Sequence, residues 1–179
     1  TDYVPTTSAA VTNYIPLLQT AQSNVPRFDN DPITGESKGL LIEESKTNLL
    51  SCSQDFDVYW YKTKVTLQTR AAIAPDGTKT AALLTGDGTS GARYLTNVLT
   101  SIGSGKTISL YAKAGTTNFI QLYTDFVNSD YANYNLSTGT VTAVGGTASA
   151  TITAVGNGWY RLTLTTGSSS SQYVNVCII

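Results

Sequence analysis

The sequence predicts an all-β protein built as an antiparallel β-sandwich, in which two sheets pack face to face. Thr, Ser, Gly and Tyr dominate its 179 residues, and a sustained 3.6-residue hydrophobic period is hard to find. Apolar and polar side chains instead alternate with a period of two in residues 107–113 and 118–126, which is typical of half-buried strands. Turn signals recur about every 8 to 12 residues, the spacing of short sandwich strands.

Residues 1–25 are predicted to form an extended arm that lies over a neighbour. The segment holds Pro5 and Pro16 among Thr, Ser, Ala, Asn and Gln, with few apolar anchors. Such a composition buries too little apolar surface to make a domain of its own.

Residues 26–48 are predicted to form a β-hairpin. Pro32 supplies the fixed φ of a turn's second position and Gly35 can take a positive φ, so the flanking runs 27–30 and 36–42 can pair. A two-stranded ribbon is not stable alone, and we therefore expect this hairpin to attach to a neighbouring subunit. Its attachment residues are predicted to be Arg27, Phe28, Pro32, Gly35, Leu40 and Ile42.

Residues 49–179 are predicted to form the sandwich body. Residues 49–69 supply its first strands and a loop, and the Gly156-Asn157-Gly158 segment is interpreted as a tight turn rather than a ligand loop. Further strands are predicted over 80–85, 93–99, 107–113, 118–126, 134–136, 140–144, 150–155, 159–165 and 173–179.

Composition excludes several classes of function. The 11 basic and 12 acidic side chains are scattered, so no nucleic-acid footprint is visible. No apolar run approaches the roughly 20 residues of a membrane span. The absence of histidine excludes Ser/His and Cys/His nucleophiles and imidazole-based zinc sites. Cys52 and Cys177 are interpreted as two buried thiols of a protein made in a reducing cytoplasm, with a bridge between them left open.

Paired carboxylates leave glycoside hydrolysis as a minor alternative, but each candidate lies at a turn or strand end, where carboxylates are common solvating groups, and we favour a non-enzymatic protein. The candidate pairs are Asp29 with Asp31, Glu43 with Glu44, Asp55 with Asp57, and Asp125 with Asp130. An oxygen-rich turn around Asp29 and Glu36 departs from a calcium loop because Pro32 and Ile33 occupy ligand positions. We therefore predict no cofactor there.

Strict alternation separates the strand side chains of the body into two sets. The inner set is predicted to be Ile108, Leu110, Ala112, Ile120, Leu122, Tyr160, Leu162, Leu164, Val174 and Val176. The outer set is predicted to be Tyr111, Lys113, Phe119, Gln121, Tyr123, Asp125, Trp159, Arg161, Tyr173 and Asn175. Rings and planar polar groups suit sugar binding, because a sugar presents an apolar face and a rim of hydroxyls. Tyr, Trp and Arg are also enriched in subunit interfaces, and for this set of side chains we favour an interface over sugar binding.

The sequence of residues 26–50 resembles a segment found in one family of proteins. Structural proteins of tailed bacteriophages, namely head fibres or spikes and some tail proteins, carry a close variant of PRFDxDPxTGExxGLLIEExxTNLL ahead of a jelly-roll, concanavalin-like domain that resembles a carbohydrate-binding module. The same modules are similar to this chain at APDGTKTA (74–81), YAKAGTTNFIQL (111–122), NLSTGTVT (135–142) and GNGWYRLTLT (156–165). Residues 1–6 are similar to the strand that closes such jelly rolls, which makes the end of a preceding module the alternative to an arm.

The resemblance implies a virion structural protein: a head fibre, spike or capsid decoration, assembled in the host cytoplasm and exposed on the particle surface. It implies self-association, with a homotrimer expected, contacts with other virion proteins, and a jelly roll that binds host-surface polysaccharide during adsorption. The alternative is a purely structural decoration, tail-fibre or adaptor protein that binds no glycan. Modules of the carbohydrate-binding type often hold a structural calcium, so such an ion stays open, without identified ligands.

Overall fold

The computed structural model describes residues 25–30, 36–42, 47–50, 52–99, 102–124, 130–167 and 173–179. Predictions for the arm up to residue 24, for the hairpin turn with Pro32 and Gly35, for residues 43–46 and for Asp125 lie outside these ranges. The chain divides into two compact units, Thr1–Lys46 and Thr47–Ile179, and each is described by itself.

The first unit contains the predicted hairpin ribbon. Strand β1 (Phe28–Asn30) pairs antiparallel with β2 (Ser37–Leu40), and the amide of Leu41 donates to the carbonyl of Arg27 at 2.8 Å. The register shifts between Asp29 and Asn30. Gly39 has a φ of 90°, a conformation that favours glycine and that accommodates a bulge here.

One face of this ribbon is apolar and exposed. Phe28 lies directly opposite Leu40, and alternation places Ile42 on the same side as Leu40. The exposed fractions of Phe28, Leu40 and Ile42 are 68%, 55% and 85%. Within the chain, these three side chains thus leave most of their apolar surface in water, which is costly at about 25 cal/mol per Å².

The second unit is the body, and its described residues contain strands and no helix, as predicted. Its strands are β3 (Trp60–Thr63), β4 (Val65–Ala72), β5 (Ala81–Gly86), β6 (Arg93–Val98), β7 (Thr107–Lys113), β8 (Phe119–Tyr123), β9 (Tyr131–Asn135), β10 (Thr140–Gly145), β11 (Ser149–Gly156), β12 (Trp159–Thr165) and β13 (Tyr173–Ile178). No helical segment of a length and apolarity suited to crossing a membrane occurs in the part of the chain that the structure describes.

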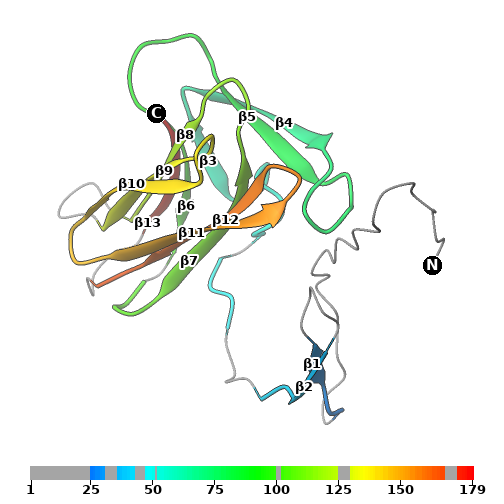
Figure 1. The fold of residues 1–179 in the computed structure, drawn as a ribbon. Helices are drawn as coiled ribbons and strands as arrows, with labels where there is room; N and C mark the ends of the chain where they lie inside the picture. Colours follow the sequence, from blue (N-terminus) through cyan, green and yellow to red (C-terminus); the bar gives the residue numbers. More distant parts are fainter. Residues whose placement is uncertain are drawn as a thin grey trace. The chain divides into compact units, whose positions relative to one another are not determined.

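The strands form two main sheets and one separate hairpin (Figure 1). The larger sheet has six strands in the order β10-β9-β8-β13-β6-β3, and the smaller has three in the order β11-β12-β7. Strands β4 and β5 pair only with each other. All pairings are antiparallel, which confirms the predicted fold class.

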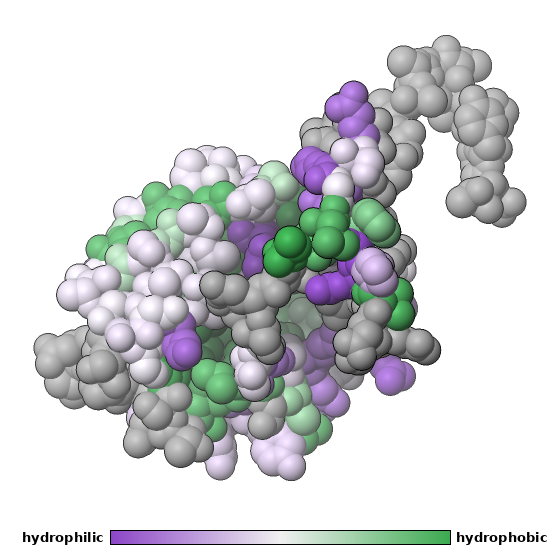
Figure 2. Space-filling view, turned by 90° about the horizontal axis from the view of Figure 1, so that it is seen from below, coloured by the Kyte–Doolittle hydropathy of each residue, from purple (hydrophilic) through white to green (hydrophobic). Residues whose placement is uncertain are grey.

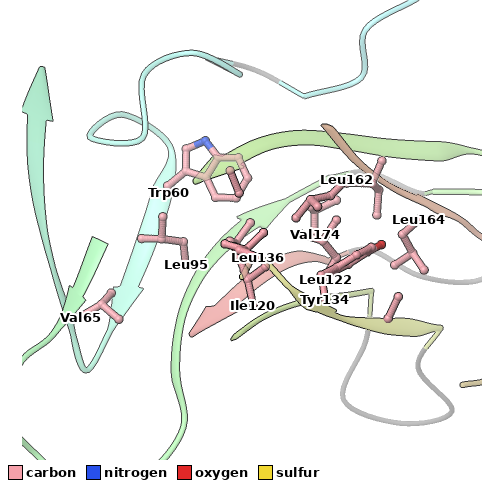
Figure 3. Close-up of a cluster of buried hydrophobic side chains, with 14 of the residues drawn as sticks. Trp60, Val65, Leu95, Ile120, Leu122, Tyr134, Leu136, Leu162, Leu164 and Val174 are labelled. Atoms are coloured by element: carbon pink, nitrogen blue, oxygen red, sulfur yellow. The ribbon is translucent and has the colours of Figure 1, made fainter. Parts of the chain in front are cut away.

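The core lies between the two sheets. Leu162 and Leu164 of β12 are fully buried and lie beside Leu122, Val174 and Tyr134 of the larger sheet (Figure 3). The predicted inner set is buried or half-buried throughout, because alternation directs one side of every strand into this layer. The hydroxyl of Tyr134 also crosses the core and donates to the carbonyl of Thr163 at 2.7 Å.

Strand β9 is longer than predicted, because it begins at Tyr131 rather than Tyr134. The predicted turn before Trp159 is confirmed. Asn157 and Gly158 link β11 to β12 with φ values of 52° and 78°, as a two-residue hairpin turn requires.

Candidate functional site

The outer face of the six-stranded sheet carries a cluster of aromatic and amide side chains. Directly paired residues in antiparallel strands point to the same side, so the register fixes the members of this face. They are Tyr61, Thr63, Tyr94, Thr96, Val98, Phe119, Gln121, Tyr123, Tyr131, Asn133, Asn135, Thr140, Ala143, Gly145, Tyr173, Asn175 and Cys177. None of these side chains is charged.

Two tyrosines cover the middle of this face. Tyr94 and Tyr123 flank β13 on either side, and their rings meet edge to face with centroids 6.2 Å apart. This contact explains why Asn175 and Cys177, on an outer face, are 0% and 6% exposed. Burial raises the pKa of the Tyr123 hydroxyl, with Cys177 and Tyr94 acting in the same direction, and burial also raises the pKa of the Cys177 thiol. Both groups therefore stay neutral at physiological pH.

The buried polar groups beneath these rings bind one another. The hydroxyl of Thr96 donates to Asn175 Oδ1 at 2.6 Å, and Asn175 Nδ2 donates to the carbonyl of Tyr123 at 3.4 Å. Asn175 was predicted to belong to a binding face. Its side chain lies on that face but is fully buried, so it supports the rings rather than reaching a ligand.

An amide pair lies beside the part of β13 that the rings of Tyr94 and Tyr123 cover. Gln121 of β8 faces Asn133 of β9, and Gln121 Nε2 donates to Asn133 Oδ1 at 2.7 Å. The remaining amide atoms, Gln121 Oε1 and Asn133 Nδ2, make no hydrogen bond to the described residues and are not buried. The pair therefore presents one acceptor and one donor, held side by side, to a ligand or to water.

Rings border this amide pair along both strands. Tyr123 and Tyr131 lie directly opposite each other on one side of it, and Phe119 lies on the other side with 42% of its surface exposed. The ring of Tyr131 occupies the space that a side chain at Gly145 would need, so it lies over the glycine backbone. We call Phe119, Gln121, Tyr123, Tyr131 and Asn133 the ring-amide patch.

The predicted outer set is divided between the two sheets. Phe119, Gln121, Tyr123, Tyr173 and Asn175 lie on the face just described. Tyr111, Lys113, Trp159 and Arg161 lie on the outer face of the three-stranded sheet, on the other side of the sandwich, because their strands β7 and β12 belong to that sheet.

The outer face of the three-stranded sheet is dominated by hydroxyls that pair with one another. Thr107 bonds Thr165 at 2.8 Å, Thr151 bonds Thr163 at 2.6 Å, and Arg161 Nε donates to Ser109 at 3.0 Å. Figure 2, which views the body from the side where β7 lies in Figure 1, shows a broad pale surface of weakly polar residues.

Sequence reasoning missed several members of the aromatic face, namely Tyr61, Tyr94, Tyr131 and Asn133. The strand of Tyr94 agrees with the predicted range 93–99, whereas the strands of Tyr61 and Tyr131 are predicted only in part, and the alternation rule is not applied to any of the three. The missing step was the strand order, because β6 and β9 join this face through pairings with β13 and β8.

The described carboxylates serve turns and backbone ties. Asp55 Oδ1 accepts the amide of Asp57 at 3.1 Å, and Asp57 pairs with Lys62 at 2.8 Å. Asp130 is 1% exposed and accepts the amides of Thr147 and Gly167 at 2.7 and 2.9 Å. The other candidate pairs, and the oxygen-rich turn proposed for calcium, include residues outside the described ranges.

Within the described ranges, no group of three or more acidic, cysteine or histidine side chains is placed to hold a metal ion. Cys52 and Cys177 are both free, the first exposed and the second buried. The prediction that both thiols are buried is confirmed for Cys177 and wrong for Cys52, which is exposed.

No protein-family model matches this chain, and no curated protein matches it.

Proposed function

We propose that this chain is a non-enzymatic structural protein of a tailed-phage virion, a head fibre, spike or capsid decoration subunit. The resemblance of residues 26–50 and of four segments of the body to such proteins supports this assignment. The all-β body is compatible with the jelly roll that the resemblance implies. The protein would be assembled in the host cytoplasm and displayed on the particle surface.

In this proposal the body binds glycans of the host surface through the ring-amide patch. The observation that carries it is the half-buried amide pair of Gln121 and Asn133, which keeps one acceptor and one donor atom unpaired between the rings of Phe119, Tyr123 and Tyr131. Rings stack on the apolar face of a sugar, and amides match its hydroxyls as donor and acceptor. Weak contacts on each copy are multiplied by many copies on one particle.

The hairpin ribbon attaches the subunit to its neighbours. Its face of Phe28, Leu40 and Ile42 is exposed within one chain, and burying it against another subunit would remove this apolar surface from water. We propose a homotrimer in which each ribbon packs on an adjacent subunit or on another virion protein.

A glycan array probed with the full chain tests the binding function. We expect binding to at least one class of glycan, lost in Tyr123→Ala and retained in the matched variant Trp159→Ala, whose ring lies on the other sheet. Both variants should keep the β-rich circular dichroism spectrum of the parent. Silence of the folded parent across a broad array would refute glycan binding.

The alternative of a purely structural decoration or adaptor protein rests on the ribbon alone. It predicts the same silence on the array, together with loss of oligomers in Leu40→Asp or Ile42→Asp while the body stays folded. Sedimentation of these variants separates attachment from glycan binding. A third and minor possibility, a glycan hydrolase, would require oligosaccharide cleavage that is lost on changing one carboxylate.

A further inference from the structure

The charge of the aromatic face restricts the ligand it can take. All the strand side chains on the outer face of the six-stranded sheet are neutral, and the pKa values of Tyr123 and Cys177 are raised so that these groups do not ionise near neutral pH. An anionic sugar seated there would lose water around its carboxylate without gaining a Lys or Arg partner from these strands. Desolvating an unpaired charge costs several kcal/mol.

The length of the ring-amide patch restricts the ligand a second time. Phe119 and Tyr123 are four residues apart on β8, which at a rise of about 3.3 Å per residue separates them by about 13 Å. Gln121 lies midway between them, on the same face. One sugar ring stacks on one aromatic side chain, so using both rings and the amide pair requires a chain of sugars.

A hydrogen bond between the two amide groups of the pair fixes their relative orientation. Gln121 Nε2 and Asn133 Oδ1 bind each other, which fixes the two amide planes and directs Gln121 Oε1 and Asn133 Nδ2 away from that bond. An adjacent acceptor and donor match two neighbouring hydroxyls, one of which donates while the other accepts. A neutral hydroxylated ligand satisfies both atoms without leaving a polar group unpaired.

We infer that the ring-amide patch binds a neutral oligosaccharide laid along β8, with Gln121 and Asn133 determining which hydroxyl pattern is accepted. This inference rests on the proposed glycan-binding function and adds the charge class, the minimum length and the residues that set specificity.

Isothermal titration of the full chain tests it with three sets of probes: neutral hexose oligomers of several lengths, oligomers of the same length that carry a uronic acid, and free hexoses. We expect neutral oligomers to bind at least tenfold more tightly than either of the other sets. Tighter or equal binding of the acidic oligomers, or of the free hexoses, would overturn the inference and leave glycan binding standing. No binding to any glycan would instead refute the proposed function, and the inference with it.

The variant Gln121→Leu tests the role of the amide pair. It removes both polar atoms of the side chain at similar volume, and we expect an affinity loss of about tenfold for the preferred oligomer and a changed ranking of oligomers that differ in one hydroxyl. Arg161→Leu, on the outer face of the other sheet, is the matched control and should change neither. An unchanged ranking in folded Gln121→Leu would refute the assignment of specificity to this pair.

Discussion

Removing the carboxylate of Asp130 should destabilise the body more than removing any exposed carboxylate. Asp130 precedes β9 and is 1% exposed. Its Oδ1 accepts the Thr147 amide at 2.7 Å and the Thr147 hydroxyl at 3.3 Å, and its Oδ2 accepts the Gly167 amide at 2.9 Å. One side chain thus ties the start of β9 to the turn before β11 and to the residues after β12.

The magnitude follows from the two backbone amides that Asp130→Ala would leave without an acceptor. Each hydrogen bond to a charged group contributes about 1.5 to 3 kcal/mol, so the loss of two such bonds should lower the free energy of unfolding by about 3 to 6 kcal/mol. Asp130→Asn keeps one acceptor oxygen and should lose about half as much. The matched control is Asp76→Ala, which removes a carboxylate that accepts the amide and hydroxyl of Thr78 in an exposed turn, where water replaces the lost acceptor, and the free energy of unfolding should fall by much less.

Urea denaturation followed by tryptophan fluorescence measures these differences. The slope of the transition should stay unchanged, because the same surface is exposed on unfolding. If Asp130→Ala lowers the free energy of unfolding no more than Asp76→Ala does, the hydrogen bonds accepted by the buried Asp130 do not stabilise the body more than those of an exposed turn.

Three further predictions concern the outer face and the thiols. Gly145→Ala should reduce glycan affinity although it replaces no residue of the ring-amide patch, because the new methyl group takes the space of the Tyr131 ring and displaces that ring. An unchanged affinity in titration would contradict this placement of Tyr131. A thiol reagent should modify one thiol per native chain, at Cys52, and two only after denaturation, because Cys177 is buried; two fast-reacting thiols in the native protein would contradict its burial. Glycan affinity should be constant from about pH 5 to 9, since the strand side chains of the face are neutral there and the raised pKa keeps Tyr123 protonated; a titration step in that range would contradict a neutral site.

The strands themselves could be predicted from local sequence. The alternation of Ile108, Leu110 and Ala112 with polar neighbours depends on adjacent residues alone, and the observed burial follows it. The turn at Asn157 and Gly158 was equally local, because positive φ values favour these residue types.

The composition of the candidate site could not be predicted in the same way. Alternation assigns a side chain to one side of its own strand, but it does not say which sheet the strand joins. Alternation therefore places Trp159 and Tyr123 in the same outer set, although they lie on opposite sides of the sandwich. The burial of Asn175 depends on the rings of Tyr94 and Tyr123, which come from distant parts of the chain.

The hairpin shows the same limit. Pro32 and Gly35 suggested a turn, and the pairing of Phe28 with Leu40 confirms the ribbon on either side of it. The bulge at Gly39 was not predicted, because a glycine within a strand signals weakened pairing without stating how the register shifts.

The measurement that tests the account most directly is titration of the full chain with a neutral oligosaccharide selected on a glycan array, repeated with Tyr123→Ala and Trp159→Ala. The account predicts saturable binding that is lost in Tyr123→Ala and unchanged in Trp159→Ala. Binding that survives in Tyr123→Ala and disappears in Trp159→Ala would place the site on the three-stranded sheet and contradict the assignment made from the ring-amide patch.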